Sequence, residues 1–317
     1  MFRTLHSFFD IARTIRNFPS VLFYAVGATN EVTASFRNGV QIDMRGKSEL
    51  GQLYSLVNIA LNSRARLVQE GVSVWSLNLS GLQVLFSTVD RGSIYRAYVF
   101  SNLHGQLHAR FPSKDLCEFY KDGRRVFYFF NPEELDSIAN LNITFARGIY
   151  DVLDVKDRIV ADVGAAYGDT ALYFALKGAK RVYSYEPVPR IAETLRRNVE
   201  VNRLEGAIKV LPFAVSDREG EALMSVPRTK GEASLFYSHK DAVKIRVKMV
   251  IPPSDADVLK LNCAGCEYAI ILKWLKSRLF NQIAVYYNAG HVQLVEKLRR
   301  LGYRVRVFPY TRMLFAT

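Results

Sequence analysis

The second half of the chain alternates β-strand-like segments with α-helix-like segments, and this pattern restricts the fold more than any other feature. After about Arg147, apolar runs of strand length are followed by helical patterns, and the order repeats. A chain that alternates in this way folds into a parallel sheet covered by helices. The predicted strands are residues 158–164, 181–186, 208–216, 257–263 and 282–287, and the predicted helices are residues 170–177, 189–202, 265–274 and 292–301.

Two further strands are predicted near the end of the chain, at residues 303–308 and 313–316. The connection between them is too short for a crossover helix, so they must pair antiparallel. In the first of them, Arg304 and Arg306 alternate with apolar residues. This alternation favours a strand with one solvated face over a surface that binds polyanions.

The first part of the chain has a different pattern, and we predict two domains, residues 1–145 and residues 146–317. Residues 1–26 and 50–65 have the apolar spacing of helices. The first of these either packs on its own domain or makes peripheral contact with a membrane surface. Together with strand-like segments at residues 72–77, 82–86 and 125–130, they predict a small α+β domain for acceptor presentation or oligomerisation.

Composition excludes several classes of protein. The chain has 317 residues, 49% of them hydrophobic, so it is not expected to be disordered. It has no apolar run long enough to cross a bilayer and no secretory leader pattern, so we expect a cytoplasmic protein. The three cysteines, Cys117, Cys263 and Cys266, predict no disulfide framework. We interpret Cys263 and Cys266 as helix-start residues packed under the sheet, in preference to a redox pair or a metal site.

A glycine-containing turn, Asp162-Val-Gly-Ala-Ala-Tyr-Gly-Asp-Thr170, follows the first strand of the predicted sheet. Its spacing is G-x-x-x-G, which is neither the G-x-G-x-x-G of nicotinamide sites nor a triphosphate-binding loop. Glu186 ends the next predicted strand, 22 residues after Gly164. A carboxylate at this place can accept hydrogen bonds from the ribose hydroxyls of an adenosine ligand.

These motifs, with Tyr185-Glu-Pro-Val-Pro-Arg190, Asn198-Val-Glu-Val-Asn202 and Pro212-Phe-Ala-Val-Ser-Asp217, resemble class I methyltransferases and, more narrowly, the FkbM family. The resemblance covers roughly residues 145–317. It implies a Rossmann-like α/β sheet with a terminal antiparallel hairpin and S-adenosyl-L-methionine as the cofactor. By this resemblance, Asp162 and Gly164 surround the methionine part, Glu186 binds the ribose, and Phe213 and Ala214 flank the adenine. The full predicted cofactor set is Asp162, Gly164, Ala165, Tyr167, Gly168, Asp169, Thr170, Glu186, Pro187, Phe213, Ala214 and Asp217.

The residues expected to contact the methyl acceptor, here called the acceptor side, depart from the family pattern. The family has acids where Asn262 and Ala264 stand, and a glutamate and a histidine where Tyr286 and Asn288 stand. An alcohol acceptor must lose a proton, and an asparagine cannot take it near pH 7. The candidate catalytic residues are therefore Asn262, to align the acceptor, and His291 or Glu267, to remove the proton.

The leading hypothesis from the sequence is O-methylation of a hydroxyl on a glycan, a glycolipid or a small metabolite. One alternative is a cofactor-binding protein with little or no activity, which acts as an interaction or regulatory subunit. Another is an RNA methyltransferase, suggested by the net charge of +13. Base methylation is disfavoured, because Asn262 is not followed by the prolines and the aromatic residue of N-P-P-[YF] sites. The sequence predicts no oligomeric state and no metal.

Overall fold

The computed structural model describes residues 15–16, 21, 31–35, 41–45, 66–69, 74–79, 82–87, 91–227, 233–236 and 242–317. The chain divides into two compact units, Met1–Val126 and Phe127–Thr317. Apart from Ile15, Arg16 and Val21, the helices predicted at residues 1–26 and 50–65 lie outside the described residues. Within the described ranges, no helix is both long enough and apolar enough to pass through a membrane.

In its described residues, the first unit contains small antiparallel sheets and one long helix. Strands β1 (Glu31–Ser35) and β2 (Gln41–Arg45) pair with each other, and a second sheet consists of β3 (Arg66–Gln69), β4 (Val74–Leu79) and β5 (Leu82–Ser87). Strands β4 and β5 confirm the strands expected at residues 72–77 and 82–86. A third sheet contains β6 (Arg110–Ser113), β7 (Leu116–Lys121) and β8 (Arg124–Phe129).

Helix α5 (Arg91–Leu107) is absent from the sequence prediction, which names no element between residues 86 and 125. Its first half is rich in aromatic and β-branched residues such as Ile94 and Tyr95, which favour strands when considered locally. The helix instead buries Ala97, Phe100 and Leu103 on one side. Tertiary packing of a helical stripe therefore overrides the local propensity.

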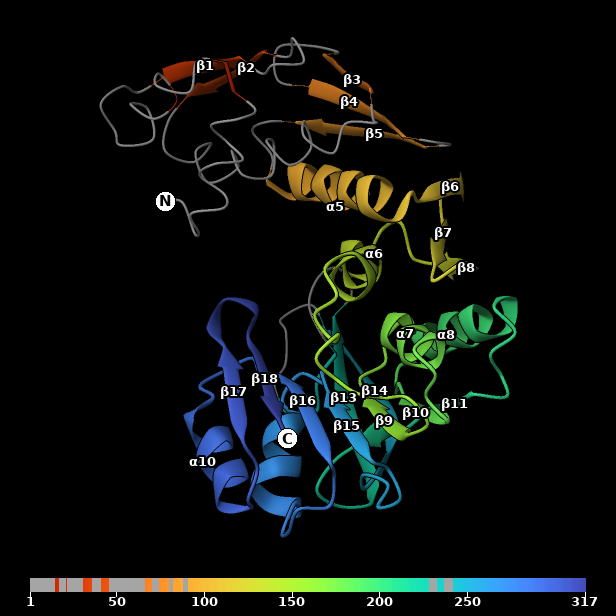
Figure 1. The fold of residues 1–317 in the computed structure, drawn as a ribbon, viewed down its shortest axis with the longest axis vertical. Helices are drawn as coiled ribbons and strands as arrows, with labels where there is room; N and C mark the ends of the chain where they lie inside the picture. The colour runs from red at the N-terminus through yellow and green to blue at the C-terminus, as the bar shows by residue number, and fades with distance from the viewer. Residues whose placement is uncertain are drawn as a thin grey trace. The chain divides into compact units, whose positions relative to one another are not determined.

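The second unit is built on a seven-stranded sheet with the order β11-β10-β9-β15-β16-β18-β17 (Figure 1). The five strands from β11 to β16 are parallel, whereas β18 runs antiparallel to both β16 and β17. The predicted parallel sheet and terminal antiparallel hairpin are confirmed. The strands are β9 (Ile159–Val163), β10 (Arg181–Tyr185), β11 (Ile208–Leu211), β15 (Val258–Leu261), β16 (Gln282–Tyr286), β17 (Val305–Phe308) and β18 (Met313–Ala316).

Helices cover both faces of this sheet. On one face, Val163, Leu261 and Val285 belong to the same buried cluster as Ile270 and Leu294, which come from the covering helices. Side chains alternate along a strand, so Asp162 and Lys260 point to the opposite face. The helices of this unit are α6 (Leu135–Leu141), η1 (Asn142–Ala146), α7 (Asp169–Leu176), α8 (Pro189–Val201), α9 (Cys266–Tyr268), η2 (Ala269–Trp274), α10 (Val292–Arg300) and η3 (Pro309–Thr311).

Two predicted elements differ in the structure. The single strand expected at residues 208–216 is divided, because Pro212 lacks the N–H that a continuous ladder needs. Its second part, β12 (Ala214–Val215), leaves the main sheet and pairs with β14 (Ala242–Val250), which also pairs with β13 (Gly220–Pro227). The helix expected at residues 265–274 consists of one short α-helical turn, α9, followed by the π-helix η2.

Residues 127–146 belong to the second unit, whereas the sequence placed the boundary at residue 145. The side chain of Asn198 explains part of this difference, because it binds both backbone groups of Phe129, at 2.6 and 2.9 Å. Asn202 does the same with Phe127, at 2.9 and 2.6 Å. The two asparagines therefore attach the end of β8 to α8 as a neighbouring strand would.

Gly164, at the end of β9, allows two backbone segments to approach each other closely. Its φ is +73°, and a Cβ at this position would lie 1.9 Å from the backbone oxygen of Asn262 and 3.2 Å from Cys263 Cα. No side chain fits in that space without moving the segment after β15. Glycine is therefore required here for packing between neighbouring strand ends.

We expect Gly164→Ala to lower the free energy of unfolding by at least about 2 kcal/mol. The left-handed backbone costs about 1–2 kcal/mol, and the forced backbone shift adds about 1–3 kcal/mol. Denaturant unfolding measures the change. Gly206→Ala is the matched control, because no atom lies within 4 Å of its Cβ position. Equal effects of the two substitutions would contradict this account.

Candidate active site

The candidate site lies at the carboxyl end of β9, where the strand order reverses. The neighbours of β9 are β10 on one side and β15 on the other. Ligands of open α/β sheets bind outside the strand ends at such a point. The backbone N–H groups of Gly164 and Ala165 both donate to Tyr185 O at 3.0 Å, and Gly168 N donates to Ala165 O at 2.8 Å. The loop is therefore held tightly between β9 and the helix α7.

Glu186 follows β10 and points toward this loop. Its Oε2 accepts from Ala166 N at 3.1 Å, and its Oε1 accepts from Val188 N at 2.9 Å. Burial raises the pKa of Glu186 to about 7, although these two backbone N–H groups favour the charged form. Each carboxylate oxygen has a further lone pair for another donor.

A buried ion pair connects β9 to β15 directly beneath the loop. Lys260 Nζ lies 2.9 Å from Asp162 Oδ1 and donates to Gly164 O at 2.8 Å. The side chains of Lys260 and Asp162 are 2% and 0% exposed. Asp162 Oδ2 also accepts from Thr170 Oγ1 at 2.8 Å. Asp162 thus fixes the start of α7 and the end of β15 from inside the protein.

A second row of polar contacts attaches residues 127–146 to the same loop. Thr144 Oγ1 donates to Asp169 Oδ2 at 2.5 Å, although burial still raises the pKa of Asp169 to about 6. Tyr167 donates to Glu134 Oε2 at 2.5 Å, and Arg190 pairs with the other oxygen of that carboxylate. The α7 end of the loop is therefore connected at two residues, Tyr167 and Asp169, to a segment that precedes β9.

The predicted cofactor residues divide into two groups. Gly164, Pro187, Phe213 and Asp217 are partly exposed. Lys248 Nζ lies 5.1 Å from the centre of the Phe213 ring. The other members are buried, and of these Glu186 faces the loop whereas Asp162 is occupied by Lys260 and Thr170. The buried members are Asp162, Ala165, Tyr167, Gly168, Asp169, Thr170, Glu186 and Ala214.

The three predicted catalytic residues have different surroundings. Asn262 is partly exposed and its backbone N–H donates to Val163 O at 3.0 Å, which places it beside the loop after β9. Glu267 is fully buried and accepts from Gly265 N at 2.9 Å, so its carboxylate is directed into its own loop. His291 is the N-cap of α10, and its ring lies 4.9 Å from that of Tyr287.

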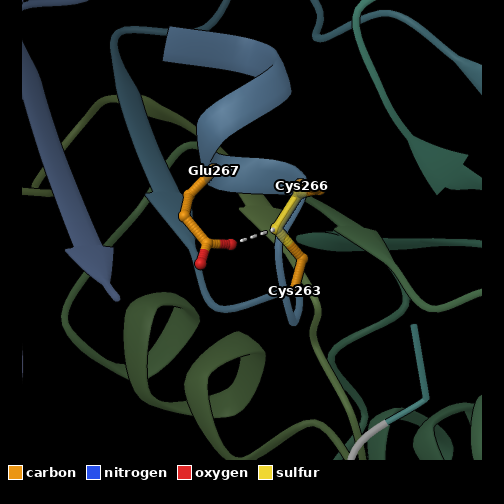
Figure 2. Close-up of side chains that lie close together, drawn as sticks. All are labelled: Cys263, Cys266 and Glu267. Atoms are coloured by element: carbon orange, nitrogen blue, oxygen red, sulfur yellow. Dashed lines mark hydrogen bonds between the residues drawn. A yellow bond between two sulfur atoms is a disulfide. The ribbon is translucent and has the colours of Figure 1, made fainter. Parts of the chain in front are cut away.

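Cys263 and Cys266 are joined by a disulfide, which contradicts the interpretation of both as simple packed cysteines (Figure 2). Positive φ angles at Ala264 (52°) and Gly265 (110°) fold the connection back on itself. The two Cα atoms lie 5.4 Å apart, within the range that a disulfide spans. With Glu267 they form the group of potential metal ligands found in the described part of the chain, but bonded sulfurs offer no thiolate.

Comparison with known protein families decides the assignment of this region. Residues 162–305 match the family "Methyltransferase FkbM domain". Over these residues the second unit is similar to an FkbM methyltransferase domain. The matched region begins at Asp162 and extends into β17, so it includes the loop, Glu186, Lys260 and the disulfide.

Two curated relatives match parts of the chain. Uncharacterized protein 158B of Sulfolobus islandicus rod-shaped virus 1 is 38% identical over 118 residues, 37% of this chain and 54% of that protein. An Uncharacterized RNA methyltransferase of Bacillus cereus is 26% identical over 196 residues, 59% of this chain and 35% of that protein. The chain therefore spans about half of the first relative and about a third of the second.

Solved structures with similarity to this chain include two TYW2 proteins. TYW2 of P. horikoshii in complex with MeSAdo has a TM-score of 0.37 and 12% identity, and covers 79% of this chain and 89% of its own. TYW2 of M. jannaschii in complex with AdoMet has a TM-score of 0.35 and 12% identity. The match covers 65% of this chain and 85% of the TYW2 chain. The family match, and not these structures, supports the assignment.

Sequence reasoning missed several residues that shape the site, chiefly Lys260, Thr144 and Glu134. The contacts of Thr144 and Glu134 join distant parts of the chain, which no local pattern reports. Lys260 carried a local signal, because a lysine inside the apolar run Val258–Leu261 has to be paired if that strand is buried. Its neighbour Asp162, in the first strand of the same predicted sheet, was the available partner.

We expect Lys260→Met to lower the free energy of unfolding by about 3–5 kcal/mol, because it leaves a buried carboxylate without its cation. The control is Arg246→Met, which breaks an exposed pair with Glu221 at the same 2.9 Å distance. Exposed pairs contribute less than about 1 kcal/mol. Chemical denaturation compares the two variants, and similar losses would refute the structural role of the buried pair.

Proposed function

We propose that the chain is an S-adenosyl-L-methionine-dependent methyltransferase that methylates a hydroxyl group. The observation that carries the proposal is the position of Glu186, whose carboxylate is bound to the loop after β9 inside a matched FkbM methyltransferase domain. A carboxylate held at the end of the second strand is where a ribose diol is recognised.

The residues at this edge fit the cofactor. Glu186 has lone pairs left after its two backbone contacts, and the partly exposed Phe213 ring offers an aromatic face for adenine. The turn at Gly164 allows a ligand to lie close to the backbone. When bound, S-adenosyl-L-methionine supplies an electrophilic methyl group on a sulfonium.

The acceptor is proposed to be a hydroxyl of a glycan, a glycolipid or a small metabolite. Asn262 lies beside the cofactor loop and can accept or donate a hydrogen bond that aligns the hydroxyl. The buried Glu267 is a poor candidate for the proton acceptor, since its carboxylate is directed into its own loop. His291 is retained as the residue that removes the proton.

RNA is the weaker candidate for the acceptor. The net charge of +13 and the name of the B. cereus relative favour it. However, the strand-end segment after Asn262 reads Cys-Ala-Gly-Cys, without an aromatic side chain to stack on a base.

Cofactor affinity is expected to rise with pH in the unmodified chain. With a pKa of about 7, Glu186 is about one-tenth ionised at pH 6 and about nine-tenths ionised at pH 8. If the carboxylate form binds the ribose, the dissociation constant falls by about tenfold over this range. Calorimetry with S-adenosyl-L-methionine measures this slope.

Glu186→Gln is the matched control for this pH series. It keeps the shape of the side chain but removes the charge, so any remaining slope reports other groups, such as Asp169 and the ligand itself. The proposal predicts that the difference between the two slopes is about tenfold over two pH units. Identical slopes in the two proteins would exclude Glu186 from the ribose site.

A second function is supported by the acceptor side. Asn262 cannot take a proton, and Ala264, where the family has an acid, is buried with a φ of +52°. A chain with these substitutions resembles a cofactor-binding subunit that transfers methyl groups slowly or not at all. Asn262 is the better position for separating the two functions, because it is partly exposed whereas Ala264 is buried.

The substitution Asn262→Asp distinguishes an active methyltransferase from a cofactor-binding subunit with little or no activity. We expect the unmodified chain to transfer methyl groups and this variant to change kcat by less than tenfold. If instead the unmodified chain shows almost no methyl transfer and Asn262→Asp raises kcat about a hundredfold or more, the chain lacks a general base at this position. Methyl transfer from labelled cofactor is measured, with Asn262→Ser as the control because it adds no carboxylate.

A further inference from the structure

The disulfide lies at the edge of the proposed cofactor site, directly after β15 (Figure 2). Cys263 is partly exposed, whereas Cys266 is 3% exposed. Cys263 is therefore the residue of the pair that a thiolate from solution reaches more readily, and Cys266 is shielded as the leaving group. This asymmetry is what directed thiol–disulfide exchange requires, because the outcome depends on which sulfur is attacked.

A buried carboxylate accompanies the two sulfurs. Glu267 Oε2 lies 3.7 Å from Cys263 Sγ and is held in place by the backbone N–H of Gly265 at 2.9 Å. Figure 2 shows this carboxylate directed toward the sulfurs. Thiols and thiolates interconvert during exchange, and a nearby group that accepts and returns a proton speeds this step. Glu267 is in position to transfer this proton, although its carboxylate is directed into its own loop.

The disulfide loop is enclosed by the elements around it. The backbone at Asn262 and Cys263 packs against Gly164 so closely that a Cβ there would clash. On another side, Ser234 Oγ donates to Ala264 O at 2.7 Å, and the Phe236 side chain lies 3.0 Å from the Cβ position of Gly265. Any rearrangement of the loop is therefore transmitted to the cofactor loop and to residues 233–236.

Reduction removes a covalent constraint from this loop. The loop also contains Ala264 in a left-handed conformation that an alanine rarely adopts. Once the bond is broken, the constraint that holds this conformation is removed.

We propose that Cys263 and Cys266 form a reversible thiol–disulfide site whose reaction partner is a dithiol, and that its redox state sets the conformation of the loop beside Gly164. One thiolate of the dithiol attacks Cys263 Sγ, and Cys266 leaves as a thiolate. The second thiol then attacks the mixed disulfide, releasing Cys263. The dithiol is oxidised to a disulfide, and its two protons pass to the two cysteines, with Glu267 as the relay.

Thiol counting tests the redox step. The native chain is equilibrated with dithiothreitol or with its oxidised form and is then denatured and alkylated. Mass spectrometry counts the alkylated cysteines. The proposal predicts three alkylated cysteines after reduction and one after oxidation. Cys117→Ser is the control and should lower both counts by one, because burial raises the pKa of this thiol and keeps it out of exchange. A count that does not respond to the redox buffer would overturn the proposal.

The role of Glu267 is tested by Glu267→Gln, which keeps an oxygen for the Gly265 N–H. We expect reduction at pH 7 to be roughly tenfold slower or more, with a flatter dependence of rate on pH and unchanged end points. An unchanged rate and pH profile would remove Glu267 from the reaction. The altered pH profile distinguishes proton transfer from a merely structural effect of the substitution.

Hydrogen exchange tests the effect on the loop without any cofactor, so its outcome is independent of the proposed function. Peptides that cover residues 162–170 and 262–268 are expected to exchange faster in the reduced chain, while α10 is unchanged. The double variant Cys263→Ser/Cys266→Ser should exchange at the rate of the reduced chain, and dithiothreitol should not change that rate. Equal exchange in the oxidised and reduced chains would refute the conformational part.

Discussion

The buried ion pair between Lys260 and Asp162 is the interaction on which the rest of the second unit depends. The two residues lie opposite each other in the register of β15 and β9, the strands on either side of the point where the sheet order reverses. Lys260 also binds the carbonyl of Gly164, and Asp162 binds Thr170 at the start of α7. One lysine thus joins two strand ends, a turn and a helix, in a place that water does not reach.

This arrangement separates the two sides of the proposed site. The cofactor side, with Glu186 bound to Ala166 N, is fixed by backbone contacts. The acceptor side depends on the segment after β15, where Asn262 precedes a disulfide and two residues with positive φ. Because a Cβ at Gly164 would clash with Asn262, the two sides share one tightly packed boundary, and a change on one reaches the other.

Much of the second unit was predictable because its signals are local. Apolar strand runs, Pro189 at the start of α8 and Gly178 after α7 mark boundaries that the structure confirms. The disulfide was missed, since spacing does not reveal that Ala264 and Gly265 turn the chain back. The helix α5 was missed because its packing outweighs the local preference for strands. The contact of Glu134 with Tyr167 depends on tertiary structure alone.

The most direct test of the central claim is a crystal structure of the chain with S-adenosylhomocysteine. The account predicts the ribose hydroxyls on the Glu186 carboxylate, the adenine against the Phe213 ring, and the sulfur facing Asn262. Ligand density elsewhere, or a Glu186 carboxylate without contact to the ribose, would contradict it.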